Sequence, residues 1–298
     1  MTTMLPYMMI AAGAALWGLI AIFVRGLSEY GFTAMEIVTI RVITASLLLI
    51  IIGLIRYRSE MKVKVRDTYL FIGTGILSIV FFNWSYFTTI NEMNVSLAVI
   101  LLYTSPAFVT ILSYIFLKEP LHMKKVFAVI GTIFGCVLIA GVSVGEANNV
   151  TMLGIVIGLC SGLGYALYSI FGKFALRKYE PFTVTLFTFV VAALFLLPVT
   201  RIWEKGALLQ PEVIGHAIGL GLFPTVIAFI LYTKGLEKVE SSKAGIIATV
   251  EPLVATFLSV FLYHESLTIF QIIGSVFILS SVLIVNFPIK MKKHRTVT

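Results

Sequence analysis

The stretch TSPAFVTILSYIFLKEPL, residues 104–121, contains a proline inside an apolar run and ends in Lys-Glu-Pro-Leu. Residues 250–267 read VEPLVATFLSVFLYHESL. Aligned without a gap, the two stretches share a proline, hydroxyl residues and a closing glutamate, at Pro106/Pro252, Thr110/Thr256, Leu112/Leu258, Ser113/Ser259, Glu119/Glu265 and Leu121/Leu267. The chain therefore contains nearly the same apolar segment twice, half a chain apart.

The composition is that of a membrane protein. The chain has 298 residues, of which 59% are hydrophobic and only 12% are charged. Its mean hydropathy is +1.03. Soluble domains carry about 25% charged residues, so this chain lacks the polar surface that water requires. Its apolar runs are about 20 residues long, the length that spans a hydrocarbon core. We therefore expect an all-α integral membrane protein.

Ten apolar runs are predicted to be membrane-spanning helices. The connections between them are short, which leaves no room for a soluble second domain. The predicted spans are 4–27, 34–55, 69–90, 95–117, 123–143, 152–176, 182–200, 213–234, 243–263 and 268–288.

The similarity between the two halves extends beyond the quoted stretches. At the same spacing, Gly73, Gly75, Tyr86, Ser96 and Ala98 align with Gly219, Gly221, Tyr232, Ser242 and Ala244. We expect two homologous repeats, 1–147 and 148–298, of five helices each. Because five is odd, the second repeat enters the membrane from the opposite side. Such a 5+5 inverted-topology repeat is typical of secondary transporters, whose substrate site lies between the repeats near the midplane. The fold predicted is therefore ten helices around a central cavity.

The distribution of Lys and Arg predicts the orientation. If the N-terminus is cytoplasmic, all but four of the 22 Lys and Arg residues lie in inner loops or in the C-terminal tail. The exceptions are Arg25, Arg201 and Lys205 outside, and Arg41 within a span. Positive residues favour the cytoplasmic side. We therefore expect a multi-pass protein of the cell membrane with both termini cytoplasmic.

Several motifs resemble a known family. LWG at residues 16–18 with Arg25 soon after, IRVITASLLL at 40–49, and the two duplicated stretches are similar to the EamA-type family of the drug/metabolite transporter superfamily. The resemblance covers both halves. It implies a carrier in which helices 1–4 and 6–9 surround a cavity and helices 5 and 10 lie at the periphery. It also implies that the solute is an amino acid or another small metabolite, in most characterised members an exported one. One departure is that Phe189 stands where the second repeat would match Arg41.

Two charged residues lie deep in predicted spans. Arg41 is about 10 Å from the outer boundary and Glu251 about 12 Å from the inner one, at 1.5 Å per residue. A charge at such depth costs about 2.5–3.5 kcal/mol, so each is expected to face protein or water. Both could be structural. Alternatively, Arg41 attracts a substrate carboxylate and Glu251 attracts an amine or a proton.

The duplicated prolines mark a candidate site. A proline within a helix leaves a backbone carbonyl without its hydrogen bond. Pro106 and Pro252 are either static kinks or gating hinges. The polar residues around them, namely Tyr103, Ser105, Thr249 and Glu251, are candidate substrate contacts. The aromatic and amide residues in mid-span, which could equally be packing residues, complete the candidates: Trp17, Asn83, Trp84, Tyr86 and Tyr165. Glu119 and Glu265, near helix ends, are expected to pair with a neighbouring Lys or His.

The sequence favours a carrier over an enzyme. It contains neither H-E-x-x-H, G-x-S-x-G nor a Walker phosphate loop, and we expect no cofactor and no metal. A phosphorylated substrate needs several cations, and Arg41 is the only deep one, so a zwitterionic or neutral solute is favoured. The alternative is efflux of cationic amphiphiles. Expected partners are the small-molecule substrate and the lipid bilayer, without nucleic acid. Proton coupling is an option, and the chain is expected to act as a monomer or a homodimer.

Overall fold

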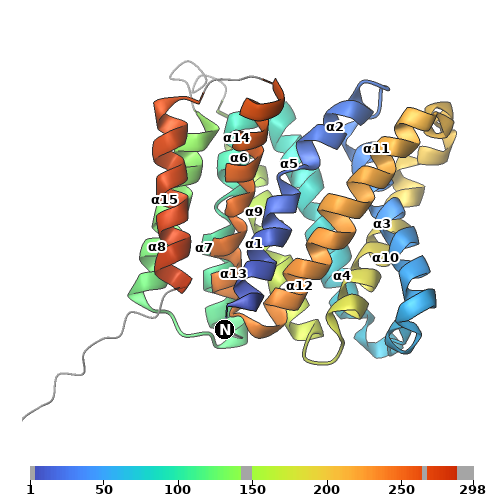
Figure 1. The fold of residues 1–298 in the computed structure, drawn as a ribbon, viewed down its shortest axis with the longest axis horizontal. Coiled ribbons are helices and arrows are strands. Elements are labelled where there is room, and N and C mark those ends of the chain that lie inside the picture. The colour runs from blue at the N-terminus through green and yellow to red at the C-terminus, as the bar shows by residue number, and fades with distance from the viewer. Residues whose placement is uncertain (1–3, 142–149, 264–266, 287–298) are drawn as a thin grey trace, which may run out of the picture.

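The computed structural model describes residues 4–141, 150–263 and 267–286, and over these ranges the chain is helical without a strand (Figure 1). All ten predicted spans are present. Nine have the length and composition of a membrane span, and the tenth apolar helix is shorter.

The first repeat contains membrane helices 1 to 5. In order they are α1 (Leu5–Trp17) with α2 (Ile20–Ser28); α3 (Ala34–Arg56); α4 (Thr68–Thr74), the π-helical η3 (Gly75–Val80) and α5 (Phe81–Glu92); α6 (Val95–Leu102), α7 (Ser105–Leu112) and the π-helical η4 (Ser113–Leu117); and α8 (Met123–Ala140).

The second repeat contains membrane helices 6 to 10. They are α9 (Met152–Ala175); α10 (Pro181–Thr200); α11 (Pro211–Gly221), the π-helical η8 (Leu222–Ile227) and α12 (Ala228–Lys238); α13 (Ser241–Ala248) with α14 (Val250–Tyr263); and α15 (Ile269–Asn286). Short 3-10 turns at Arg58–Met61, Val65–Asp67, Ile202–Glu204 and Gly206–Leu209 lie in the connections.

Local sequence determines where several of these helices begin. Thr33 and Glu36 form a reciprocal capping box at the start of α3, with the Glu36 carboxylate accepting the Thr33 N–H at 2.7 Å. The Asn94 side chain accepts the Leu97 N–H at 2.8 Å and so caps α6. Proline lies in the first turn of α7, α10 and α11. The N–H groups of a first turn have no partner within the helix, so proline loses no hydrogen bond there.

Two kinds of interior irregularity recur at equivalent places in the two repeats. Membrane helix 4 is interrupted at residues 103–104, and membrane helix 9 is interrupted at Thr249, each time just before the duplicated proline. The π-helical segments η3 and η8 likewise occupy matching positions in membrane helices 3 and 8. The prolines therefore follow breaks in the helices. At the second break, the Thr249 hydroxyl donates a hydrogen bond to the Ile246 carbonyl at 2.6 Å.

The main helix contacts cross from one repeat to the other. Helix α1 packs on α12, and its symmetry counterpart α9 packs on α5. Equivalent helices also pack on each other, namely α3 on α10, α7 on α13, and α8 on α15. The α8–α15 pair forms one edge of the molecule in Figure 1, at the periphery of the fold. The approach of α1 to α12 requires Gly13, because a Cβ atom there would lie 2.6 Å from the Ala228 carbonyl oxygen. The two repeats thus form one interlocked inverted-repeat bundle.

Candidate binding chamber between the repeats

A cavity of about 480 Å³, called here the chamber, lies between the repeats. Its volume is within the range of small-molecule sites. It extends to Val24, Ile90, Val99 and Ala140, which lie toward the helix ends opposite the N-terminus. Its other lining residues come from membrane helices 1 to 5 and 9: Trp17, Gly18, Ile20, Ala21, Arg41, Phe82, Asn83, Tyr86, Phe87, Leu102, Tyr103, Ile139, Glu251, Pro252, Ala255, Thr256 and Ser259.

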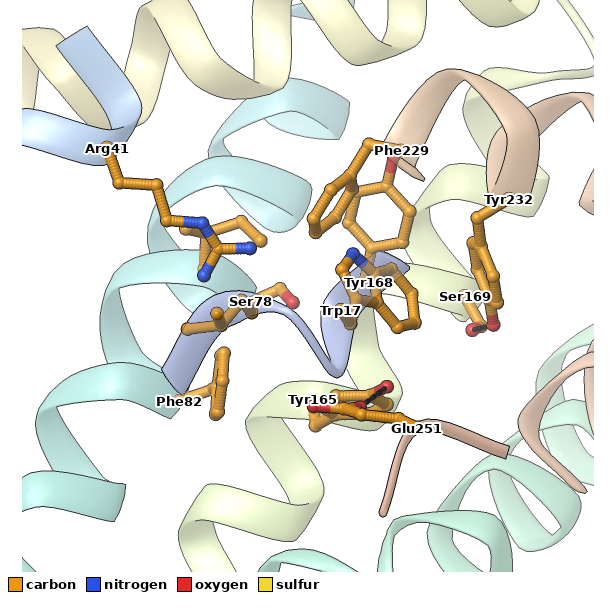
Figure 2. Close-up of a pocket in the computed structure, with 12 residues that line it drawn as sticks. Trp17, Arg41, Ser78, Phe82, Tyr165, Tyr168, Ser169, Phe229, Tyr232 and Glu251 are labelled. Atoms are coloured by element: carbon orange, nitrogen blue, oxygen red, sulfur yellow. Dashed lines mark hydrogen bonds between the residues drawn. The ribbon is translucent and has the colours of Figure 1, made fainter. Parts of the chain in front are cut away.

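A smaller cavity of about 40 Å³, called here the recess, adjoins the chamber (Figure 2). The two cavities share Trp17, Ile20, Arg41, Phe82 and Glu251 as lining residues. The recess is further lined by residues of η3, α9 and membrane helix 8: Ser78, Ile79, Tyr165, Tyr168, Ser169, Phe229 and Tyr232. Both repeats therefore contribute to it.

Arg41 extends from α3 to the recess and is anchored to the second repeat. Its Nε donates to Thr225 Oγ1 at 2.9 Å, and its Nη2 donates to the Pro224 carbonyl at 3.4 Å. The Thr225 hydroxyl in turn donates to the carbonyl of Leu220, five residues earlier, at 2.7 Å. The π-helical turn of η8 thus presents a hydroxyl acceptor to the guanidinium. The guanidinium carbon of Arg41 also lies 5.8 Å from the centre of the Phe229 ring. Among the residues that the structure describes, no carboxylate forms an ion pair with Arg41, which is held by a hydroxyl and a carbonyl.

Glu251 enters the same space from the first turn of α14. Its Oε2 accepts a hydrogen bond from the Tyr165 hydroxyl at 3.1 Å. The structure describes both Glu251 and Arg41 and records no ion pair between them. The cavity is therefore lined by one acidic and one basic side chain that are hydrogen-bonded to different groups of the second repeat instead of to each other.

Five aromatic rings that line the recess pack against one another, and we call them the aromatic layer. The Trp17 ring lies 5.0 Å from the rings of Phe229 and Tyr232 and 5.9 Å from that of Tyr165. Tyr168 packs edge-on against Phe229 at 5.0 Å. These rings separate the chamber from the helix ends that lie on the side of the N-terminus.

Hydroxyl pairs fix this layer between α9 and α12. Tyr168 shares a hydrogen bond of 2.7 Å with Thr233, and Ser169 shares one of 2.8 Å with Tyr232. One turn further along α9, the Lys173 ammonium donates to the carbonyls of Leu236, Glu237 and Val239 at 2.6, 3.2 and 2.8 Å. The end of α12 is thereby capped by a cation, which is the favourable charge for a helix C-terminus.

Two side chains of the first repeat bind the segment between α12 and α13 and the start of α13. Glu119 accepts hydrogen bonds from the backbone N–H groups of Ser241 and Ser242 at 2.6 and 3.1 Å, and Lys125 pairs with Glu240 at 2.7 Å. We call Glu119, Lys125 and Lys173, together with residues 236–242, the 236–242 clamp. Glu119 was expected to pair with a Lys or His, but it caps the first turn of α13 instead; Glu265 lies outside the described residues.

The structure places most of the predicted site residues at the cavities. Trp17, Arg41 and Glu251 line both, Tyr165 lines the recess, and the remaining chamber residues among those predicted are Asn83, Tyr86, Tyr103 and Pro252. Trp84 is 48% exposed and packs on Phe81. Ser105 and Thr249 are buried outside the cavity linings, and Pro106 lies in the first turn of α7. Substrate contact by any of these residues stays a prediction.

Sequence reasoning missed several residues at the site. Ser78, Thr225 and Phe229 had no signal, because a hydroxyl or a phenyl ring in a membrane helix is common. Tyr232 had one, since it aligns with Tyr86 in the repeat. Lys173 had no signal for its role as a cap, because that role depends on how α12 ends.

Comparisons with known proteins agree with this architecture. The model of the EamA-like transporter family matches residues 4–141 and again residues 152–287. An uncharacterized transporter of Archaeoglobus fulgidus is 32% identical over 70% of this chain and 75% of its own length. A second one from that organism is 27% identical over 95% of this chain and 99% of its own length. A crystal structure with 18% identity superposes with a TM-score of 0.77, covering 94% of this chain and 96% of that chain, which shows the fold alone. The chain belongs to the EamA-like transporter family.

Proposed function

We propose that this protein moves a small zwitterionic or neutral metabolite, such as an amino acid, across the cytoplasmic membrane. The observation that carries the proposal is the pair Arg41 and Glu251, a basic and an acidic side chain that line one cavity without forming an ion pair. A zwitterion carries both complementary charges. It would satisfy each side chain at once, whereas a neutral solute would use the hydroxyl and aromatic groups around them.

Alternating access between the two sides is the proposed mechanism. The chamber extends toward one set of helix ends, while the aromatic layer and the 236–242 clamp block the other. An inverted repeat can exchange these two arrangements by rocking one bundle against the other. No covalent step is needed, and we propose that the protein is not an enzyme.

The proposed orientation puts both termini in the cytoplasm. It rests on the Lys and Arg bias of the loops, and it makes the clamp cytoplasmic and the chamber outward-facing. The proposed direction, export, follows the family resemblance. Two homologous repeats, 1–147 and 148–298, remain the proposed division of the chain, and a monomer or homodimer the proposed assembly.

Efflux of a cationic amphiphile is a second candidate. The aromatic residues of the chamber, including Trp17, Phe82 and Tyr86, together with Glu251 favour it, because aromatic faces attract cations. The two candidates differ in their need for Arg41, since a cation has no group for a guanidinium.

Counterflow in proteoliposomes tests both candidates. Vesicles preloaded with one amino acid should take up its labelled form transiently above equilibrium if the protein is an amino-acid carrier. A panel of amino acids and lipophilic cations identifies the class. Counterflow with cations alone would favour efflux of amphiphiles, and non-saturable flux without counterflow would contradict a carrier.

A further inference from the structure

Two buried polar groups at the recess have no hydrogen-bond partner among the residues that the structure describes. They are the indole Nε1 of Trp17 and the hydroxyl of Ser78, in side chains that are 5% and 1% exposed. A buried donor without a partner costs about 1–3 kcal/mol, so proteins rarely keep one without a bound water or ligand. Both residues line the recess, which makes it a place where a polar group can bind.

Arg41 supplies a third donor group to the same space. Its two recorded hydrogen bonds use Nε and Nη2 and leave Nη1 for other acceptors. In Figure 2 the guanidinium of Arg41 and the hydroxyl of Ser78 extend toward the space that Trp17 borders. The three groups come from α3, η3 and α1, and so from three different membrane helices.

The chemistry of these groups selects an acceptor with negative charge. An indole N–H and a guanidinium can only donate, and a serine hydroxyl can donate as well. Charge-assisted hydrogen bonds between guanidinium and carboxylate are strong and often bidentate. An ammonium group has no acceptor lone pair, so it would leave the indole N–H unsatisfied, and Arg41 would repel it.

The size of the recess fits a carboxylate. Its volume of about 40 Å³ corresponds to roughly three water-sized groups. A carboxylate consists of one carbon and two oxygens. A phosphoryl group is larger and carries more charge than a single guanidinium balances.

We propose that Trp17 Nε1, Ser78 Oγ and Arg41 form a carboxylate subsite in the recess. The bound solute places its carboxylate there and its amine toward Glu251 and the Tyr165 hydroxyl. The inference rests on the proposed function in taking the solute to be zwitterionic. It adds a rule of selection: the protein binds amino acids more tightly than the amides and amines derived from them.

The first test measures binding by the purified full-length protein. Thermal-shift titration compares an amino acid that shows counterflow with its amide, in the parent and in Trp17→Phe and Ser78→Ala. Each variant should weaken the affinity for the amino acid about fivefold to tenfold and leave that for the amide unchanged. Ser85→Ala is the matched control, because the Ser85 hydroxyl is also buried without a partner but lies outside both cavity linings. Parental affinities in both variants would overturn the subsite.

The second test needs no transported solute. The chain has 3 Trp residues, so ¹⁵N-Trp labelling gives three indole N–H signals, and Trp17→Phe assigns one of them. Titration with acetate should move the Trp17 signal downfield, acetamide should not, and Arg41→Met should abolish the acetate effect. No shift, or an equal shift with acetamide, overturns the subsite even when transport is established. An acetate-specific shift without transport of any amino acid keeps the subsite and overturns the proposed function.

Discussion

Glu119 and Ser242 are joined by two hydrogen bonds across the repeat interface. The Oε2 atom of Glu119 accepts the backbone N–H of Ser242 at 3.1 Å and its hydroxyl at 2.6 Å. Glu119 follows the last turn of membrane helix 4 and is 8% exposed, whereas Ser242 is in the first turn of α13. The glutamate therefore connects the end of one duplicated helix to the beginning of its counterpart.

Removing this connection should open the 236–242 clamp. Glu119→Ala leaves the donors of Ser241 and Ser242 without their acceptor, which should weaken the closed arrangement by about 1–3 kcal/mol. A cysteine at the buried position Ala244, in a background without Cys136 and Cys160, should then react faster with a maleimide. Glu204, an exposed acid in the connection between α10 and α11 and outside the clamp, provides the control Glu204→Ala. Equal labelling rates in Glu119→Ala and the control would contradict the role of the clamp.

The anchor of Arg41 should matter as much as its charge. Arg41→Lys keeps the charge but loses the hydrogen bond of Nε to Thr225, so transport should fall about tenfold or more while the protein still inserts. Thr225→Val removes only the acceptor and should lower transport about fivefold. Thr188→Val, at a buried threonine that bonds Thr74, controls for the loss of any buried hydroxyl. Parental transport in Arg41→Met would show that the guanidinium does not bind substrate.

Glu251 should determine whether transport follows a proton gradient. Glu251→Gln mimics the protonated carboxyl, so it should abolish transport driven by a pH gradient and retain part of the substrate exchange. Tyr165→Phe keeps the carboxyl but removes its hydrogen bond of 3.1 Å, and it should remain gradient-driven. The measurement is uptake in proteoliposomes with and without a pH step. Unchanged gradient-driven uptake in Glu251→Gln would exclude this residue as the proton carrier.

The proposed orientation predicts opposite labelling of two loops. Lys62→Cys and Gly206→Cys lie at exposed positions in connections on opposite sides of the membrane. In intact cells an impermeant thiol reagent should label the cysteine at 206 and leave the one at 62 unmodified until the membrane is permeabilised. Labelling of position 62 from outside would reverse the topology and place the clamp outside the cell.

The clamp should also weaken in acid. Partial burial raises the pKa of Glu240, but the ion pair with Lys125 and the charge of Lys243 lower it more, so its pKa is below the usual value. Stability from such a group is present above about pH 4, the pKa of an unperturbed Glu, and is lost as pH falls through the folded pKa. Lys125→Met should reduce the loss of unfolding free energy between about pH 4 and about pH 2, followed as the fall in Tm, by an amount on the order of 0.5 kcal/mol. Equal falls in the two proteins would contradict this effect.

The sequence was sufficient to predict the fold and the two charges of the site. Ten apolar runs and the duplicated proline segment require an inverted helical bundle, and burying Arg41 or Glu251 in lipid is too costly for either to face outward. Both therefore had to lie at the interior, where the structure has them.

Helix rotation was harder to predict from sequence. Trp17 and Trp84 look alike in sequence, yet one borders the chamber and the other is exposed. Membrane helices are apolar on every side, so periodicity does not tell which face is buried. Ser78 and Thr225 were missed for the same reason, and because the wide turns of η3 and η8 change which residues face inward.

The contacts between α1 and α12, α5 and α9, and α3 and α10 make the two halves of the chain depend on each other. Each pair joins the two repeats, so a single five-helix unit leaves its largest packing faces uncovered. Such a unit buries those faces only against a unit inserted upside down, so neither half is a folding domain by itself.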